Sequence, residues 1–414
     1  MDPISASTAA VPGEAGEVVA KVTVRKGREE RARLGHPWVF AGEVYQLPPA
    51  EADGHPVAVE DARGRLLGVG LANTRSNILV RLMTRQREPL DRAFFQRRIE
   101  EALALRGRFG RLSPGPDAAW RVIHGEADGL PGLIVDRYGG WLVVQALSLG
   151  MAQRLPMVLD LLQAALAPRG IYERSDVPVR ALEGLPPTAG VLWGEPPPED
   201  LVIEEHGMRL RVDLVGGQKT GFFLDQRLNR AHVRHLSAGL GRVLNTFCYS
   251  GGFSVAAALG GAEQVVSVDI SAEAIALAEQ NAGLNGVAAR CEFQTANAFD
   301  ALREYERAGE RFDMVILDPP AFTKNKDSIP GAVRGYKEIN LRAMRLLNPG
   351  GLLVTSSCSH HISPALFGSI VADAAADTRK RLRQLALRGP SPDHPTLPAA
   401  PETDYLKYLV AEVR

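Results

Sequence analysis

From Arg242 to the C-terminus, short apolar runs alternate with segments of helical periodicity, and this alternation constrains the fold more than any other feature of the chain. The apolar runs lie at 243–247, 265–269, 291–294, 312–317 and 352–356, with helical patterns at 272–285 and 333–347. Strands that alternate with helices pair in parallel, so the pattern predicts a doubly wound, Rossmann-like α/β sheet. A last alternating run at 405–413 is expected to join this sheet as an edge strand.

The chain before this region divides into further parts. Alternating runs at 18–24, 56–60, 66–71 and 78–83, separated by Gly, Pro and Asn turns, predict a small all-β barrel. A charge-rich helical run at 91–108 followed by apolar strand runs predicts an α+β middle domain. Residues 1–17, rich in Ala, Ser, Pro and Gly, are expected to form a disordered extension. The predicted domain limits are 18–89, 90–216 and 217–414.

The composition restricts the classes of protein that the chain can belong to. Its 414 residues carry 48 basic and 48 acidic side chains, so overall charge indicates nothing about nucleic acid. Three Cys without paired or metal-type spacing predict reduced thiols and no metal site. No apolar run approaches the roughly 20 residues that span a bilayer, and the N-terminus lacks the pattern of a secretory signal. We therefore expect a cytoplasmic protein without a membrane partner.

Basic residues concentrate at the start of the predicted barrel. Residues 21–33 hold six basic and two acidic side chains, a local charge of +4, and His36-Pro-Trp-Val-Phe40 follows. Basic side chains beside aromatic ones suit a phosphate backbone with bases stacked nearby. A solvated barrel edge over a core that contains Trp38 and Phe40 explains the same pattern, and for the aromatics it is the preferred interpretation. The candidate RNA contacts in this segment are Arg25, Lys26, Arg28 and Arg31.

Polar residues at successive strand ends predict a cofactor pocket, because the carboxyl ends of parallel strands line one crevice. The first run leads into Phe247-Cys-Tyr-Ser-Gly-Gly-Phe253, whose adjacent glycines allow a ligand to approach the backbone. Asp269 ends the second run, about 20 residues on, where a carboxylate can bind both ribose hydroxyls. A helix N-cap before Ser271 is the alternative role for this residue.

The third strand end and the loop type narrow the cofactor. Asn297 could read an adenine edge and Phe299 could cover the face of the base. The loop is neither G-x-G-x-x-G nor a P-loop, so we expect a nucleoside without a pyrophosphate, namely S-adenosylmethionine. The run at 217–230 could close over it, although a helix cap with a solvated face explains that run as well. The candidate cofactor-binding residues are Asp225, Gln226, Asn245, Phe247, Tyr249, Ser250, Gly251, Gly252, Asp269, Ile270, Asn297, Ala298, Phe299 and Asp318.

Two further strand ends carry a carboxylate and a thiol. Asp318-Pro-Pro320 follows the run at 312–317, and Cys358 lies in Thr355-Ser-Ser-Cys-Ser359. A thiolate that adds to C6 of cytosine makes C5 nucleophilic enough to accept a methyl group, so Cys358 is the candidate nucleophile. Its pKa must then fall below the free value of about 8.5. Asp318 is the candidate partner of the N3 edge, a role that favours a pKa raised by burial.

Each of these two residues also has a plainer interpretation. Asp318 could be a structural turn residue, and Cys358 could be a buried, inert thiol. The carbonyls of the Pro-Pro turn could accept from the exocyclic amine of the base. The candidate substrate contacts at this crevice are Pro319, Pro320, Phe322 and Lys324.

Taken together, the motifs resemble the class I S-adenosylmethionine-dependent methyltransferases that form 5-methylcytosine in large-subunit (23S) ribosomal RNA. The motifs are Gly217-Gln-Lys-Thr-Gly221 with Leu224-Asp-Gln-Arg227, Phe-Cys-Tyr-Ser-Gly-Gly-Phe, Asp318-Pro-Pro-x-Phe322, Gly335-Tyr-Lys-Glu-Ile-Asn340 and Ser-Cys-Ser. The resemblance implies a PUA-type RNA-binding domain at 18–89 and an EEHGD-type middle domain at 90–216. Glu204-Glu-His-Gly207 matches the latter up to Met208, which replaces its Asp.

The resemblance also implies the reaction, in which a methyl group passes to C5 of a ribosomal RNA cytosine through a covalent bond between Cys358 and C6. Many enzymes that form RNA 5-methylcytosine carry a second Cys directly after Pro-Pro, which expels the first. This chain has Ala321 there, so elimination must use another base, such as water or Asp318.

Other functions stay open at this point. An RNA methyltransferase on the same scaffold could act on a guanine or adenine nitrogen, which needs no thiol. Against adenine stands Ala321, where an aromatic residue would be expected to stack on the base. A non-catalytic assembly factor that binds S-adenosylmethionine and RNA would need neither Asp318 nor Cys358. An exposed barrel edge permits a homodimer without requiring one.

Overall fold

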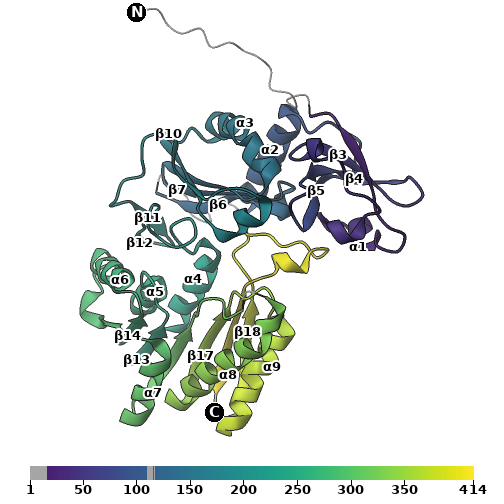
Figure 1. Cartoon of the computed structure of the whole chain (residues 1–414). Coiled ribbons are helices and arrows are strands. Elements are labelled where there is room, and N and C mark those ends of the chain that lie inside the picture. Colours follow the sequence, from purple (N-terminus) through teal and green to yellow (C-terminus); the bar gives the residue numbers. More distant parts are fainter. Residues whose placement is uncertain (1–15, 110–114, 116, 324) are drawn as a thin grey trace, which may run out of the picture. The chain divides into compact units, whose positions relative to one another are not determined.

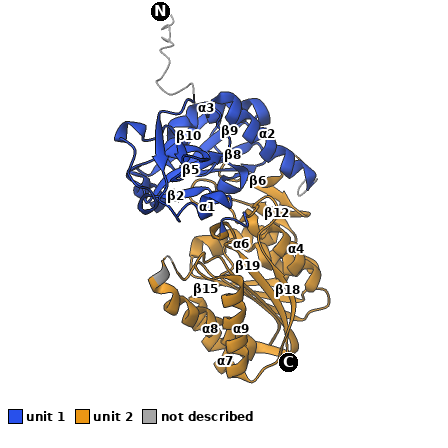
Figure 2. Ribbon diagram, turned by 90° about the vertical axis from the view of Figure 1, so that its right-hand side faces the viewer, with its two compact units in different colours: residues 1–111, 121–197, 397–400 blue, residues 112–120, 198–396, 401–414 orange. Residues whose placement is uncertain are grey.

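The computed structural model describes residues 16–109, 115, 117–323 and 325–414, and Figure 1 shows its helices and strands. Lys324, a predicted substrate contact, lies outside the described residues, as do residues 1–15 of the predicted extension. The chain forms two compact units, coloured in Figure 2. Unit 1 holds residues 1–111, 121–197 and 397–400, and unit 2 holds residues 112–120, 198–396 and 401–414. The domain limits given above stay a prediction.

Unit 1 begins with the predicted small β-structure. Its five-stranded sheet has the order β1-β3-β4-β5-β2, with β1 and β3 parallel and the other pairs antiparallel. The strands are β1 (Ala20–Thr23), β2 (Trp38–Phe40), β3 (Pro56–Glu60), β4 (Leu66–Ala72) and β5 (Ile78–Thr84), and helix α1 spans Glu30–Arg33. Valines at 22, 39, 57 and 59 pack in its core with Leu79. Trp38 and Phe40 are half-buried at the ends of β2, beside that core.

The rest of unit 1 is a second five-stranded sheet with two long helices. Its order is β10-β9-β8-β7-β6. The elements are α2 (Arg92–Arg108), β6 (Ala119–His124), β7 (Leu133–Tyr138), β8 (Trp141–Ala146), α3 (Leu149–Leu166), β9 (Gly170–Ser175) and β10 (Thr188–Gly194). Asp91 starts α2 by accepting a hydrogen bond of 2.9 Å from the backbone N–H of Phe94. The expected α+β arrangement is therefore present.

Unit 2 is built on a seven-stranded sheet of order β15-β14-β13-β16-β17-β19-β18. The first five strands of this order are parallel, and β19 is antiparallel to both of its neighbours. The strands are β13 (Arg242–Thr246), β14 (Gln264–Asp269), β15 (Cys291–Thr295), β16 (Phe312–Leu317), β17 (Leu347–Ser357), β18 (Leu382–Arg388) and β19 (Lys407–Val413). The predicted Rossmann-like doubly wound fold is confirmed.

One strand position differs from the prediction. β19 lies between β17 and β18 and is not an edge strand. Six of its seven residues are buried, as a strand covered on both faces requires, whereas β18 at the edge is mostly exposed. β19 has an apolar sequence because it lies inside the sheet.

Helices cover both faces of this sheet. They are α4 (Arg227–Leu236), α5 (Gly252–Gly260), α6 (Ala272–Leu284), α7 (Ala298–Ala308), α8 (Ile329–Leu346) and α9 (Pro364–Thr378). α4, α5 and α6 pack together, as do α7, α8 and α9. Side chains alternate along β13, so Leu244 joins the core under α7, α8 and α9, whereas Asn245 faces α5.

A short hairpin precedes these elements in unit 2. Strands β11 (Val202–Glu205) and β12 (Met208–Arg211) pair antiparallel around His206 and Gly207. Both turn residues have positive φ, 49° and 75°, which is the geometry of a two-residue turn with matching strand twist. β12 packs on α5 and α6, so the hairpin belongs to the helical layer that contains α4.

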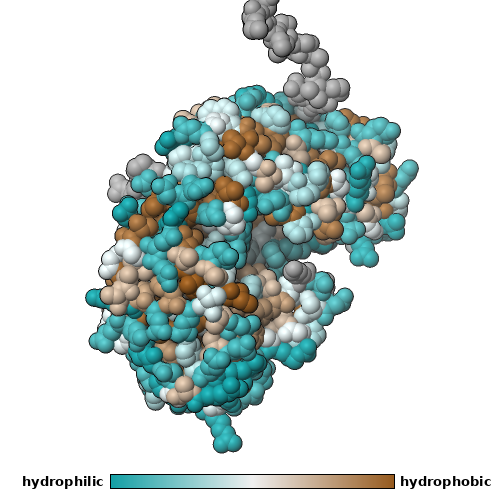
Figure 3. Space-filling model, turned by 60° about the vertical axis from the view of Figure 1, so that its left-hand side comes forward, coloured by the Kyte–Doolittle hydropathy of each residue, from teal (hydrophilic) through white to brown (hydrophobic). Residues whose placement is uncertain are grey.

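The outer surface is of mixed polarity. Within the described face drawn in Figure 3, hydrophobic side chains occur in small patches separated by hydrophilic ones. None of the described helices combines the length and the apolar character needed to cross a membrane.

Candidate functional site

The predicted polar residues of unit 2 gather where the parallel strands end. β13, β14, β16 and β17 run in the same direction, so the loops that follow them lie at one edge of the sheet. The antiparallel strand β19 starts at that edge, and its first residue, Lys407, pairs with Ser357 at the end of β17. The site is therefore built from four strand ends and one strand beginning.

The loop after β13 has an unusual backbone. Phe247 and Tyr249 adopt positive φ, 59° and 47°, although neither is glycine. Asp269, at the end of β14, stabilises this loop because its Oδ2 accepts a hydrogen bond of 2.8 Å from the backbone N–H of Tyr249. Its Oδ1 accepts from the N–H of Ser271 at 3.1 Å, and Ser271 rather than Asp269 caps α6. The alternative of a helix-capping Asp269 is thus not what the structure shows.

Gly251 packs closely on helix α6. It adopts a φ of 77°, and a Cβ placed on it would lie 2.8 Å from the Cβ of Ala278 in α6. That distance is too short for two carbon atoms, so the packing of the loop on α6 requires glycine at this position. The expected approach of a ligand to this loop stays a prediction.

The segment at 217–226 contacts this loop. The hydroxyl of Tyr249 accepts from the backbone N–H of Gln218 at 3.2 Å and donates to the carbonyl of Gly221 at 3.4 Å. The end of the segment is held by Arg230 of α4, which donates to the carbonyl of Phe223 at 2.9 Å. Arg230 in turn forms two hydrogen bonds of 2.6 Å with the buried carboxylate of Glu205 in the β11–β12 hairpin.

Two consecutive side chains of this segment reach into the site. Asp225 is buried, and its Oδ2 accepts from Lys219 Nζ at 3.1 Å and from the Tyr405 hydroxyl at 2.7 Å. Its Oδ1 is buried without a hydrogen-bond partner among the described residues. Burial alone would raise the pKa of Asp225, but Lys219, His394 and the Tyr405 hydroxyl together lower it, so this carboxylate is ionised.

Gln226 connects the segment to Asp318. Its Nε2 donates to Oδ1 of Asp318 at 2.9 Å. Burial first, and then the neighbouring charge of Asp225, raise the pKa of Asp318 to about 7 against the opposing effects of Lys219 and Gln226. Asp318 can therefore carry a proton near neutral pH, as expected for a residue that donates to a ring nitrogen.

Cys358 lies beside this carboxyl. It follows β17, is half-buried, and its Sγ donates to the carbonyl of Pro319 at 3.9 Å. The expectation of a lowered thiol pKa is wrong for this structure. Burial raises the pKa of Cys358, and the carboxylates at 318 and 225 raise it further, whereas Lys219 and Lys407 lower it.

Four rings form a cluster next to the β13 loop. Phe322 packs on Tyr336 with ring centroids 4.6 Å apart and lies 5.8 Å from Phe299 and 6.5 Å from Phe247. Phe322, a predicted substrate contact, is therefore part of the same aromatic cluster as two predicted cofactor contacts. Pro319 is buried beneath the turn and Pro320 is exposed.

Two predicted cofactor contacts form hydrogen bonds within the protein. Asn245 is fully buried inside the sheet layer, where it donates to the Ser254 hydroxyl at 2.9 Å, because strand alternation directs it toward α5. The side-chain oxygen of Asn297 caps α7 by accepting from the N–H of Phe299 at 2.9 Å. Ile270 is 71% exposed next to Asp269, Ala298 is buried in α7, and the Ser250 hydroxyl is buried without a partner among the described residues.

The four predicted RNA contacts of unit 1 differ in their exposure and in their contacts within the protein. Arg25, Lys26 and Arg28 are exposed, although Arg25 donates from Nε to the carbonyl of Val44 at 2.7 Å. Arg31 lies 2.6 Å from the ring nitrogen of His36 and stacks over the Phe40 ring at 4.9 Å. Two of the four predicted RNA contacts, Arg25 and Arg31, thus also have structural partners.

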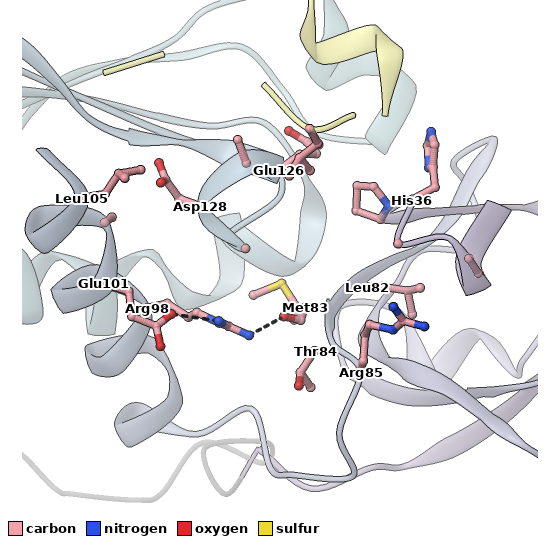
Figure 4. A pocket seen from close by; sticks show the side chains of 17 residues that line it. His36, Leu82, Met83, Thr84, Arg85, Arg98, Glu101, Leu105, Glu126 and Asp128 are labelled. Carbon is pink, nitrogen blue, oxygen red and sulfur yellow. Dashed lines mark hydrogen bonds and ion pairs between the residues drawn. The ribbon is translucent and has the colours of Figure 1, made fainter. Parts of the chain in front are cut away.

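Unit 1 contains a cavity of about 390 Å³, shown in Figure 4. Its walls include His36 after α1, Arg98 of α2 and Glu126. Arg98 is already engaged there, donating to the carbonyl of Met83 at 3.2 Å and to Glu101 at 2.8 Å. None of the predicted contact residues lines this cavity, so it is separate from the site at the strand ends.

Sequence reasoning missed three residues of the site: Lys219, Tyr405 and Lys407. Lys219 and Tyr405 both bind Asp225, and Lys407 lies at the strand beginning next to Cys358. Lys219 stands in the quoted Gly-Gln-Lys-Thr-Gly run, and Lys407 is a charged residue at the start of an apolar strand. Both residues could therefore have been found from the sequence. No group of His, Cys, Asp and Glu suited to hold a metal ion occurs within the described ranges.

Comparisons with known proteins agree with this architecture. A family model described as S-adenosylmethionine-dependent methyltransferase matches residues 179–400, and a PUA-like domain model matches residues 22–85. A solved protein assigned as an S-adenosylmethionine-dependent methyltransferase from Streptococcus mutans superposes with a TM-score of 0.82 at 23% identity, covering 95% of this chain and all of that one. A further crystal structure, of a protein assigned as a methyltransferase and complexed with SAH, gives a TM-score of 0.83 at 23% identity with the same coverage.

Relatives of higher identity share almost the whole length. The Ribosomal RNA large subunit methyltransferase I of Cronobacter sakazakii is 42% identical over 395 residues, which cover 95% of this chain and 99% of that protein. The protein of the same name from Salmonella arizonae is 43% identical over 395 residues, covering 95% of this chain and 97% of its own.

Proposed function

This chain belongs to the S-adenosylmethionine-dependent methyltransferase family, and from that premise we propose that it methylates C5 of a cytosine in large-subunit ribosomal RNA. The name of its relatives and the PUA-like match at 22–85 support ribosomal RNA as the substrate. The exposed Lys26 and Arg28 supply positive charge for its phosphates.

The residues after β13 and before α4 fit the cofactor. S-adenosylmethionine, when bound, supplies a sulfonium methyl group next to an amino acid moiety and a nucleoside. Asp225 Oδ1, which has no hydrogen-bond partner in the described part of the chain, is an ionised acceptor for an ammonium group. The Ser250 hydroxyl, likewise without a partner there, is a further polar contact. Asp269 retains acceptor capacity for ribose hydroxyls beyond its two backbone bonds, since a carboxylate has about four lone-pair sites.

The observation that carries the choice of C5 is the meeting of a thiol and a protonatable carboxyl at neighbouring strand ends. Cys358 Sγ lies 3.9 Å from the carbonyl oxygen of Pro319, the residue directly after Asp318. Methylation of a ring nitrogen needs no thiol, because nitrogen already has a lone pair. A thiol held on the turn that follows a carboxyl able to protonate N3 is what a carbon nucleophile requires.

Each residue then has a defined task. The Cys358 thiolate forms a bond from Sγ to C6 of cytosine, and the electron pair of the C5–C6 double bond moves toward N3, to which Asp318 donates its proton. C5 becomes electron-rich and would form a bond to the methyl carbon as the bond between that carbon and the cofactor sulfur breaks, with its electron pair left on sulfur. N3 later releases its added proton to water, so that neutral 5-methylcytosine forms. A base then removes the C5 proton, and the electron pair of that bond re-forms the double bond as the Sγ–C6 bond breaks. Ala321 cannot act as this base, so the ionised Asp318 or water takes the proton.

A mechanism-based trap tests this proposal. RNA that carries 5-fluorocytosine has no C5 proton to lose, so the adduct with Cys358 should accumulate as a band that survives denaturing electrophoresis. The test uses the full chain, S-adenosylmethionine and a large-subunit ribosomal RNA transcript, with Cys358→Ala beside Cys291→Ala as the matched control. We expect the adduct with wild type and C291A and none with C358A. Full methyl incorporation by C358A would exclude methylation at carbon and favour a ring or amino nitrogen.

A further inference from the structure

Lys407 occupies a position next to Cys358 that the mechanism above does not use. It is the first residue of β19 and pairs across the sheet with Ser357, the residue before Cys358. Its Nζ donates to the carbonyl of Ser359 at 2.7 Å and to that of Tyr405 at 2.6 Å. The residue is 1% exposed. Its amine is therefore fixed on the backbone that immediately follows the thiol.

The hydrogen-bond acceptors of this buried amine are backbone carbonyls. Among the described residues, no Asp or Glu oxygen lies within ion-pair distance of Lys407. A buried ammonium that has only carbonyl dipoles for partners is costly, so a nearby negative charge would be strongly favoured. In the part of the chain that the structure describes, the groups that interact electrostatically with Cys358 are Lys219, Asp318, Asp225, Lys407 and the phenol of Tyr336. Those that interact with Lys407 are Cys358, Asp404 and His360.

Lys219 lowers the pKa of Cys358 more than Lys407 does, but its charge is shared with a carboxylate and exposed to water. It pairs with Asp225 at 3.1 Å, and its side chain is 40% exposed. Its charge is largely compensated by that carboxylate and screened by water. Lys407 is neither paired in this way nor exposed.

We propose that Lys407 is a positioning residue that holds the Cys358–Ser359 backbone and serves as the counter-ion of the Cys358 thiolate. The inference rests on the proposed function for the choice of Cys358 as nucleophile. Burial lowers the pKa of Lys407 to about 8, and the neighbouring thiol acts in the opposite direction. In return, Lys407 is one of the two cations that lower the pKa of Cys358 against the effect of burial.

Alkylation of the thiol tests this inference without RNA or cofactor. The rate at which iodoacetamide modifies Cys358 is measured by peptide mass spectrometry on the full chain between pH 6 and pH 10. Wild type is compared with Lys407→Met, Lys407→Gln and Lys407→Arg. Met removes the charge and the hydrogen-bond donors, Gln keeps donors for the two carbonyls without the charge, and Arg keeps the donors and the charge. Cys291, half-buried on β15, serves as the internal reference in every sample.

We expect K407M and K407Q to shift the Cys358 profile to higher pH, with alkylation at pH 7.5 slower by at least about tenfold, equivalent to one pKa unit. K407R should stay close to wild type, and the Cys291 profile should not move. If K407M does not fold, the K407Q and K407R pair gives the same comparison. An identical Cys358 profile in K407Q and wild type would overturn the proposal.

The two proposals fail in different ways. If Cys358 is not the nucleophile, the 5-fluorocytosine adduct is missing while the alkylation profile still depends on residue 407. If Lys407 is not the counter-ion, the adduct forms in wild type and the alkylation profile ignores the substitution. In an active enzyme, K407Q should lower kcat with little change in KM. The part of the kcat profile that rises with pH should shift to higher pH, as the alkylation profile does.

Discussion

Gln226 donates a hydrogen bond of 2.9 Å to Oδ1 of Asp318 and so joins the segment before α4 to the end of β16. An amide donor stabilises the ionised carboxylate, yet burial still raises the pKa of Asp318 to about 7. The cost of taking this carboxylate out of water is thus larger than the gain from the hydrogen bond. The folded protein tolerates a destabilising charge at this position, which is typical of a functional site.

This imbalance predicts how stability depends on pH. The pKa of Asp318 is higher in the folded protein than its value of 3.8 in the unfolded chain, so the folded state binds the proton more tightly. The stability that this tighter proton binding gives the folded state is fully present below pH 3.8 and is lost as the pH rises through about 7. The free energy of unfolding of Asp318→Asn minus that of wild type should therefore increase by about 2–4 kcal/mol from pH 4 to pH 8. Urea unfolding at the two pH values measures this.

Asp313 of β16 provides the control of opposite sign. Hydrogen bonds from the backbone of Gly241 and Arg242 and from Asn348 lower its pKa against the effect of burial. Its stabilising contribution is present above pH 3.8 and is lost as the pH falls below that value. Asp313→Asn should therefore lose stability at pH 8. A D318N difference from wild type that does not change with pH would contradict the raised pKa.

The buried pair of Glu205 and Arg230 gives a second prediction. Arg230→Met leaves the Glu205 carboxylate buried without its two hydrogen bonds of 2.6 Å, which should cost about 3–5 kcal/mol of stability. Glu205→Gln with R230M should cost less than R230M alone, because no uncompensated charge remains. Since Arg230 also binds the carbonyl of Phe223, R230M should weaken S-adenosylmethionine binding in calorimetry. If the double variant costs the sum of the two single changes, the two residues are not coupled.

The sequence predicted those strands whose burial produces a local run of apolar residues. Apolar runs bounded by turns identified β13, β14 and β16 to within one residue, because strands buried on both faces read as continuous apolar segments. The same reasoning missed β18, whose residues are mostly exposed and show no apolar run. It also could not place β19, since the order of strands depends on contacts between distant segments.

The site was predicted in part for the same reason. Residues at strand ends, such as Asp269, Asp318 and Cys358, follow from sequence position once the sheet is parallel. The burial of Asn245 and the packing of Gly251 on Ala278 depend on the direction of a side chain and on the distance to α6. The raised pKa of Cys358 likewise arises from desolvation and from Asp225, which is 133 positions away in the chain.

The tight packing at Gly251 yields a third prediction. Gly251→Ala introduces a Cβ 2.8 Å from the Cβ of Ala278 at a φ of 77°, so we expect a loss of stability of about 2–3 kcal/mol and a shift of the β13 loop. Cofactor affinity in calorimetry should fall with it. Gly283→Ala in α6 is the matched control, because nothing lies within 4 Å of its Cβ and alanine favours a helix. G283A should be neutral or slightly stabilising, and equal stability of G251A and wild type would refute the steric argument.

The exposed basic residues of unit 1 yield the last prediction. Lys26 and Arg28 are exposed, whereas Arg25 and Arg31 also hold the barrel through Val44 and His36. If the first two contact phosphates, replacing both with Ala should weaken binding to ribosomal RNA and reduce the slope of log affinity against log salt by about 1.4–1.8. Stability should be unchanged, because exposed side chains without burial contribute little. Filter binding from 50 to 300 mM salt measures the slope. The control is the double Ala variant of Arg63 and Arg65, which are also exposed in this domain and remove the same amount of charge. If the control loses the same slope, the effect comes from the overall charge of the protein and not from phosphate contacts of Lys26 and Arg28.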